Sequence, residues 1–129
     1  MIEETLQQIK EIRDFLGKQK MSSLGLEECS QMAVKLSTLK VSLGEHLGGL
    51  ESELEASENA VYFVYRNKEE MSQEDAKRQA RADLKDRRVE SAKLDYLRRD
   101  IGDLITSLQS RTKVLLEEKR DTNFGEKKR

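Results

Sequence analysis

The chain has 129 residues, with 24 basic and 25 acidic side chains, so its net charge is close to zero. This balance argues against a general coat for nucleic acid, which needs a strongly basic surface. Charged residues make up 38% of the chain and aromatic residues 5%, and proline is absent. Such a composition excludes a thick globular core and favours narrow apolar seams between long helices.

Neither secretion nor membrane insertion is indicated by the sequence. The single cysteine, Cys29, allows no internal disulfide, and the N-terminal segment carries acidic residues, unlike a secretion signal. No apolar run approaches the roughly 18 residues that a membrane-spanning helix requires. We therefore expect a cytoplasmic protein that has no membrane partner.

Two helices are predicted in the first half of the chain. Apolar residues recur every three or four positions over residues 2–16 and again over residues 26–65, which is the spacing of one helix face. Gly17 is a natural end for the first helix. Three glycines interrupt the second helix, and each costs about 1 kcal/mol relative to alanine. At Gly44, Gly48 and Gly49 we expect a bend, a close backbone approach, or a break near residues 48–49.

A third helix is predicted over residues 73–120. Ser72 is a good N-cap, with Asp75 three positions later, close to the pattern of a capping box. The apolar seam of this helix is thin in its first half and strong in its second half. Beyond the helix, residues 121–129 are predicted to form a flexible tail.

The second and third helices are predicted to be antiparallel neighbours, because residues 66–71 are too few for any other connection. Residues 26–71 carry nine acidic and four basic side chains, a net charge of −5, whereas residues 72–129 carry twelve and sixteen, a net charge of +4. Antiparallel pairing brings these opposite charges together and predicts that Glu58 faces Ala80 and Leu50 faces Arg88. The predicted fold is all-α: one domain over residues 1–129, with a long, coiled-coil-like antiparallel hairpin and a short N-terminal helix.

Self-association is predicted because a hairpin with one short helix cannot cover all of these apolar residues. Aromatic and branched side chains surround the second helix near its end, which indicates burial on more than one side. We therefore predict a homo-oligomer. Its predicted interface consists of Phe63, Val64, Leu97, Ile101, Leu104 and Leu108.

Catalytic chemistry is not indicated. The only histidine, His46, and the only cysteine, Cys29, both lie at seam positions, where an interior packing role is the favoured interpretation. No metal-binding, phosphate-loop, nucleophile-elbow or dinucleotide motif is present. We therefore predict that the protein is not an enzyme, that it has no cofactor and that it has no metal site.

A line of basic residues on the third helix has two interpretations. Four of them recur at i, i+4, i+8 and i+11, on one helix face. The favoured interpretation is a solvated face that pairs with the second helix. The alternative is a site for phosphate, either in single-stranded DNA or in a small nucleotide, with tyrosines across the turn as stacking partners. The alternative site consists of Tyr62, Tyr65, Arg66, Lys77, Arg78, Arg81, Lys85 and Arg88.

Two stretches carry a resemblance to a known group of proteins. EDAKRQARADLKDRR (residues 74–88) and LITSLQSRTKVLLEEKRDTNF (residues 104–124) resemble small, highly charged helical proteins from early gene clusters of tailed bacteriophages, often near recombination and single-strand-binding genes. The resemblance covers roughly residues 55–124. It implies a phage-encoded accessory protein in the bacterial cytoplasm that acts by protein contacts in DNA metabolism or in counter-defence against the host.

Overall fold

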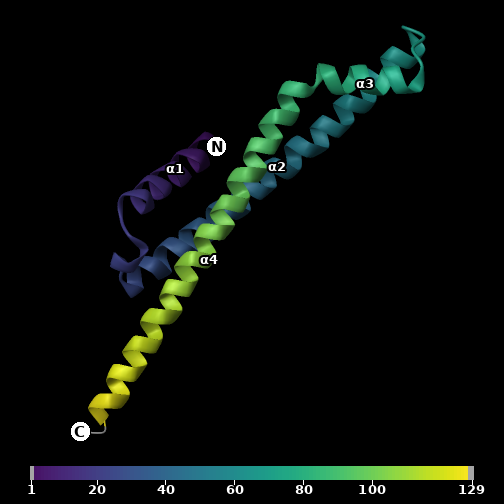
Figure 1. The fold of residues 1–129 in the computed structure, drawn as a ribbon. Helices are drawn as coiled ribbons and strands as arrows, with labels where there is room; N and C mark the ends of the chain where they lie inside the picture. Colours follow the sequence, from purple (N-terminus) through teal and green to yellow (C-terminus); the bar gives the residue numbers. More distant parts are fainter. Residues whose placement is uncertain (1, 128–129) are drawn as a thin grey trace. The chain divides into compact units, whose positions relative to one another are not determined.

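The computed structural model describes residues 2–127 of the chain, and the side chains of residues 2–121 (Figure 1). Within this part the regular structure is helical and no strand is present, so the predicted all-α class is confirmed. In chain order the elements are α1 (Ile2–Lys18), the short 3-10 helix η1 (Met21–Ser23), α2 (Leu26–Asn67), α3 (Gln73–Asp83) and α4 (Lys85–Lys127).

Contacts within the chain separate two compact units, where we predicted a single domain. Unit 1 contains the described residues up to Leu43 and those from Arg98 onward, and unit 2 contains Gly44–Leu97. The long helices α2 and α4 each contribute residues to both units.

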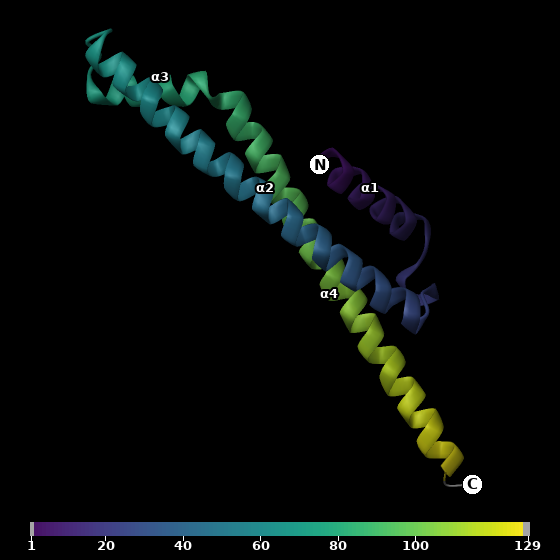
Figure 2. The ribbon, with the colours of Figure 1, turned by 180° about the vertical axis from the view of Figure 1, so that it is seen from behind.

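Unit 1 packs α1, the first part of α2 and the second part of α4 around large apolar side chains. In both views α1 lies alongside the other two segments (Figure 2). Arg13 of α1 lies 3.7 Å from Asp100 of α4, and Lys40 of α2 lies over Gly102 of α4. The buried residues of unit 1 are Ile9, Ile12, Leu24, Cys29, Ala33, Leu36, Leu39, Leu43, Ile101, Ile105 and Leu108.

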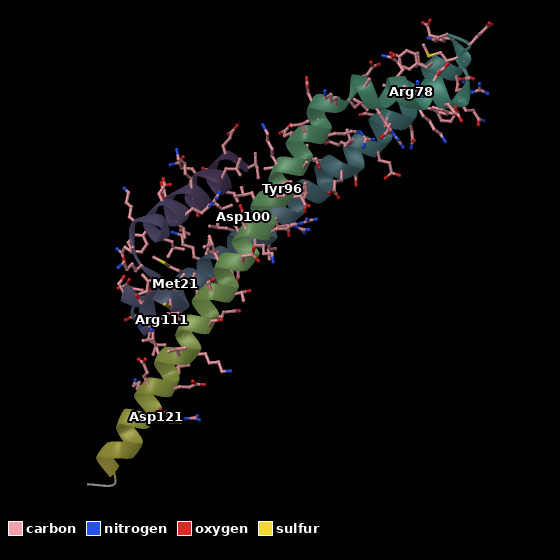
Figure 3. All side chains as sticks on the ribbon, viewed as in Figure 1. Met21, Arg78, Tyr96, Asp100, Arg111 and Asp121 are labelled. Atoms are coloured by element: carbon pink, nitrogen blue, oxygen red, sulfur yellow. The ribbon has the colours of Figure 1, made fainter. Side chains whose placement is uncertain are left out.

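The connection between α1 and α2 is anchored on α4. The Ser23 hydroxyl donates to the Lys20 carbonyl at 2.6 Å, which closes the η1 turn, and Leu24 is buried to 1% exposure behind it. Arg111 Nη2 donates to the Ser22 carbonyl at 3.0 Å, and Figure 3 shows Arg111 close to the turn that contains Met21. The connector is therefore an ordered part of unit 1.

Unit 2 packs the second part of α2 against α3 and the beginning of α4, with small residues at the contact. Its buried side chains are Leu47, Ala76, Ala80 and Leu94. The predicted N-cap is confirmed, because the Ser72 hydroxyl accepts from the Asp75 N–H at 3.2 Å. Small side chains at the contact allow α3 to approach α2 closely.

The helix predicted over residues 73–120 is divided in two, which corrects the prediction. Leu84 has φ −104° and ψ 13°, outside the helical region, and the direction of the chain changes between α3 and α4 (Figure 1). The Leu84 N–H still donates to the Ala80 carbonyl at 3.3 Å, and its carbonyl accepts from Arg88 at 3.1 Å. The bend therefore keeps these backbone hydrogen bonds. It also allows α3 to pack along α2, with Ala76 and Ala80 buried at the contact.

Two further predictions about helix ends and breaks are corrected by the structure. Helix α4 continues to Lys127, where we predicted a flexible tail over residues 121–129, and residues 128–129 lie outside the described residues. The stretch from Glu117 to Asn123 contains neither proline nor glycine, the two strongest helix breakers, so no residue there forces the helix to end. Helix α2 is continuous through Gly48 and Gly49, around which no atom lies within 4 Å of an added Cβ. These glycines therefore mark neither a break nor a close backbone approach.

Candidate functional site

The turn between α2 and α3 brings together several residues of the predicted phosphate site, but it uses them for its own structure. The Met71 N–H donates to the Tyr65 carbonyl at 3.1 Å, and Arg66 Nη1 donates to the Met71 carbonyl at 2.8 Å. Both backbone groups of Met71 are thereby tied to the end of α2. Glu70 takes the left-handed conformation, with φ 51°, that reverses the chain. Arg66 thus acts as a brace for the turn.

Tyr65 and Asp83 join the end of α2 to the end of α3. The Tyr65 hydroxyl donates to Asp83 Oδ2, and Gln79 Nε2 donates to Asp83 Oδ1 at 2.9 Å. The bond from Tyr65, with help from Gln79, lowers the pKa of the Asp83 carboxyl. The same bond to Asp83 is the main cause that raises the pKa of the Tyr65 hydroxyl. The Tyr65 hydroxyl therefore already has a hydrogen-bond partner within its own chain.

Glu58 of α2 contacts both sides of the bend at Leu84. Its Oε1 lies 3.6 Å from Arg81 Nε on α3, and its Oε2 pairs with Arg88 Nη2 on α4. The Glu58 side chain is 24% exposed, whereas that of Arg81 is 68% exposed. Exposed ion pairs of this kind contribute at most about 1 kcal/mol each. They orient the helices more than they stabilise them.

The predicted pairing of the acidic and basic stretches is therefore present, but it is concentrated on Glu58. The predicted register holds near the turn, because Glu58 and Ala80 line one surface hollow. Farther from the turn the register shifts: Arg88 pairs with Glu58, whereas we predicted that Arg88 faces Leu50. The bend at Leu84 explains the shift. Among the described side chains, Glu53 and Glu55 make no ion pair.

Two neighbouring hollows lie on the surface of unit 2 and share Lys77 and Arg81. One, of about 260 Å³, lies between α2 and α3, and the other, of about 320 Å³, lies along α3 and includes Arg78. Figure 3 shows Arg78 on α3. Each hollow also contains a carboxylate, Glu58 or Glu74, which opposes an anionic ligand. The first hollow is lined by Glu58, Asn59, Tyr62, Lys77, Ala80 and Arg81, and the second by Glu74, Lys77, Arg78 and Arg81.

The structure thus divides the predicted phosphate site. Tyr62, Lys77, Arg78 and Arg81 line the hollows. The other four residues do not line these hollows: Tyr65, Arg66 and Arg88 make the contacts described above, and Lys85 is exposed at the beginning of α4.

The outer face of α2 in unit 2 carries a stripe of exposed apolar residues, which we call the α2 stripe: Ala56, Ala60, Phe63 and Val64. Phe63 is 60% exposed and Val64 is 45% exposed. The Phe63 ring contacts the Tyr62 ring edge to face, with centroids 5.8 Å apart, which orients it. Sequence reasoning singled out Phe63 and Val64 but missed the two alanines, because alanine suits any face of a helix. Their spacing of i, i+4, i+7 and i+8 was the available signal.

The other four residues of the predicted oligomer interface, all on α4, are more buried in the single chain than we predicted. Ile101 and Leu108 are each 0% exposed within a single chain, where we predicted that a second subunit covers them. Leu97 and Leu104 are half-buried. The reason is that α1 and α2 cover the apolar side of α4 in unit 1 more completely than we expected. Of the predicted interface, Phe63 and Val64 are the residues that stay exposed.

His46 and Cys29 form no chemical site with their neighbours. His46 is half-buried on α2, and among the described residues no group of three or more His, Cys, Asp or Glu could hold a metal ion. Cys29 is 0% exposed, and burial raises the pKa of its thiol in spite of the opposing charge of Arg111. A buried thiol of raised pKa is a poor nucleophile.

Comparison of the chain with protein-family models, with curated proteins and with solved structures finds no match. In the part of the chain that the structure describes, no helix is both long and apolar enough to cross a membrane. Any functional conclusion therefore depends on the surface of the molecule itself.

Proposed function

We propose that the chain is a non-catalytic helical interaction protein that works by protein–protein contacts. One observation supports this proposal above others. Tyr65, Arg66 and Arg88 are engaged inside unit 2, whereas the apolar Phe63 and Val64 face outward on α2. Exposed apolar side chains that are grouped on a helix face are typical of protein-binding surfaces.

Several features of this proposal come from the sequence. The helices pack as a coiled-coil-like hairpin, and the chain assembles as a homo-oligomer. From the bacteriophage resemblance we propose that the protein acts in the cytoplasm of a bacterial host, in DNA metabolism or in counter-defence. The charged faces keep such a protein soluble while its apolar stripe selects a partner.

A second candidate function is the binding of a phosphate-bearing ligand. The hollow between α2 and α3 favours it, because Lys77 and Arg81 lie there beside the Tyr62 ring. A ring next to cations suits a nucleotide or a single-stranded DNA base with its phosphate. Glu58 reduces the positive charge of this hollow, and for that reason we rank this function second.

The two functions are separated by two double variants of the full chain. We expect Phe63→Ser with Val64→Ser to abolish assembly, measured as mass by light scattering, and Lys77→Ala with Arg78→Ala to leave that mass unchanged. We expect no salt-sensitive binding of a labelled single-stranded oligonucleotide or of a nucleotide by the unmodified protein. Salt-sensitive binding that Lys77→Ala with Arg78→Ala removes, with assembly unaffected by the Phe63 and Val64 changes, would overturn the proposed function in favour of the second candidate.

A further inference from the structure

We infer that one side of α3, which carries Lys77, Arg78 and Arg81 and which we call the basic flank, is the docking surface for an acidic segment of a partner protein. This inference rests on the proposed function, because it names the chemistry of one protein partner. It depends on three features of unit 2: the side of α3 on which the basic residues lie, the shortage of carboxylates around them, and the size and lining of the neighbouring hollow.

Helix α3 carries opposite charges on its two sides. At about 100° per residue, Lys77 and Arg81 lie about 60° and 100° from the buried Ala80 on one side of the helix. Asp83 lies about 60° from Ala80 on the other side, and hydrogen bonds within unit 2 already hold it. The basic flank instead lines the two hollows, and Arg78 extends it toward the outer face of α3.

Carboxylates are too few to balance the basic flank. Lys77 and Arg78 make no ion pair with any side chain of residues 2–121. Arg81 lies 3.6 Å from Glu58, but Arg88 of α4 also uses that carboxylate. Lys77 and Arg81 are four residues apart on one helix face, a spacing at which like charges repel each other. An anionic partner would relieve this repulsion, so the basic flank is suited to bind one.

The charges around the hollows favour protein carboxylates over phosphates. Glu58 lines one hollow and Glu74 lines the other. A terminal phosphate carries a charge of about −1.5 to −2, so these two groups repel it more strongly than they repel a single carboxylate. Glutamates four residues apart on a partner helix have the same spacing, ~5–6 Å between Cβ atoms, as Lys77 and Arg81. A protein segment also brings N–H groups that can donate to Glu74.

The hollow between α2 and α3 suits an apolar side chain of the same segment. Its lining includes the Tyr62 ring and Ala80, beside Lys77. Its volume of about 260 Å³ is smaller than the roughly 300–1,000 Å³ of pockets that enclose small molecules. We therefore expect a partner segment that places an apolar side chain against the Tyr62 ring and its carboxylates on the basic flank.

The basic flank is separate from the apolar residues on which the proposed function depends. Glu58 faces α3 and α4, as its contacts show. At about 100° per residue, Tyr62 lies about 40° from Glu58 around α2. Phe63 and Val64 lie about 140° and 120° from Glu58, in opposite directions and on the other side of the helix. The two surfaces can therefore be removed one at a time.

Binding of synthetic peptides to the full chain, followed by fluorescence anisotropy, tests the inference. The probe is a labelled helical peptide with two glutamates four residues apart and a leucine on the same face, and its match has glutamine at both positions. We expect the acidic peptide to bind, more weakly as the salt concentration rises, and the glutamine peptide to bind much more weakly. Lys77→Ala with Arg78→Ala should weaken binding of the acidic peptide about tenfold, because two charge pairs are lost.

Two further variants sharpen this test. Lys119→Ala with Arg120→Ala is the matched control, since it removes the same Lys-Arg dipeptide from an exposed part of α4, and it should leave peptide binding unchanged. Lys77→Glu with Arg78→Glu should lose the acidic peptide and bind a peptide with lysines in place of the glutamates. Circular dichroism of each variant checks that the helices remain intact.

Three binding results would overturn the inference: an acidic peptide that fails to bind, a control variant that weakens binding as much as Lys77→Ala with Arg78→Ala does, or a single-stranded oligonucleotide that binds through Lys77 and Arg78 in place of the peptide. A changed mass of the Lys77→Ala with Arg78→Ala variant would also overturn it, since a second copy of the chain would then cover the basic flank.

The Phe63→Ser with Val64→Ser variant separates the inference from the proposed function. We expect this variant to lose assembly and to keep the acidic peptide. If assembly is lost and the unmodified protein does not bind the peptide, the inference fails and the proposed function stands. If assembly is unaffected and the peptide binds through Lys77 and Arg78, the contact at Phe63 and Val64 fails and the inference stands.

Discussion

Units 1 and 2 are built from the same long helices but are held together differently. In unit 1, leucine and isoleucine side chains such as Ile9, Leu36 and Ile101 are at most 1% exposed. In unit 2, two of the four buried side chains are alanines, Ala76 and Ala80. Unit 2 adds polar contacts between its helices, from Tyr65 to Asp83 and from Glu58 to two arginines.

The difference shows that one charged helical sequence can contain a part that stabilises the fold and a part that leaves apolar side chains exposed. Burial of a leucine or isoleucine side chain contributes about 1.5–3 kcal/mol, whereas an exposed ion pair contributes at most about 1 kcal/mol. Unit 1 therefore supplies most of the stability. Unit 2 depends on directional contacts that set its geometry, and it leaves the large apolar residues of the α2 stripe free for a partner.

The largest effect is expected from a cavity in unit 1. Leu36→Ala should lower the free energy of unfolding by about 2–5 kcal/mol, because Leu36 is 0% exposed. Leu54→Ala is the matched change in unit 2, where the side chain is half-buried and the loss should be smaller. Urea unfolding followed by circular dichroism measures both values. Equal losses would contradict the difference between the two units.

The second largest effect is expected where α3 packs closely on α2. Ala80→Leu should lower the free energy of unfolding by about 1–3 kcal/mol, because Ala80 is 0% exposed and a larger side chain forces α3 away from α2. Ala82→Leu, at an exposed position of the same helix, is the control and should have little effect. Faster amide hydrogen exchange confined to unit 2 would locate the damage. A tolerated Ala80→Leu would show that the small residues are not needed for the contact.

A smaller effect, in the opposite direction, is expected at the glycines of α2. Gly48→Ala and Gly49→Ala should each raise the free energy of unfolding by about 0.5–1 kcal/mol, since an added Cβ meets nothing within 4 Å. Gly102→Ala should raise the free energy of unfolding by less, because the added Cβ would lie 3.1 Å from Lys40 Nζ, which must move aside. Thermal unfolding compares the three variants. Destabilisation by Gly48→Ala would mean that α2 bends there.

The smallest effect concerns pH and the bond between Tyr65 and Asp83. The pKa of Asp83 is lowered, so its contribution is present above the ordinary value of 3.8 and is lost as pH falls through the lowered pKa. The pKa of Tyr65 is raised, so its contribution is present below the ordinary value of 10.0 and is lost as pH rises through the raised pKa. Tyr65→Phe should therefore lower Tm at neutral pH. At low pH and at high pH its Tm should approach that of the unmodified protein.

Tyr96→Phe is the control for this comparison, because Tyr96 is 69% exposed on α4. Its Tm should follow that of the unmodified protein at every pH. A constant difference between Tyr65→Phe and the unmodified protein across the pH range would show that the hydroxyl contributes without its carboxylate partner.

Much of the architecture could be predicted from local signals. Helix periodicity and the Ser72 cap depend on neighbouring residues, and both were visible in the sequence. The bend at Leu84 was not visible, because no proline or glycine marks it and because the burial of Ala76 and Ala80 beside it depends on tertiary packing. In the same way, the helical pattern of α4 contained no signal for an end at residue 120.

The candidate site was harder to predict, because its residues acquire their roles through tertiary contacts. Tyr65 and Arg66 have the chemistry of a phosphate site, yet the reversal at Glu70 directs them to Asp83 and to the Met71 carbonyl. Residue type alone could not distinguish a brace from a ligand-binding group. Exposure, which identified the α2 stripe, follows only from the packed structure.

The most direct test of this account is the mass of the unmodified full chain in solution, measured by light scattering over a range of concentrations. If the chain assembles through Phe63 and Val64, the mass rises above the 14.9 kDa of one chain and returns to 14.9 kDa when Phe63→Ser and Val64→Ser are introduced. A mass of 14.9 kDa at every concentration, or an oligomer that these two changes leave intact, would contradict the proposed function.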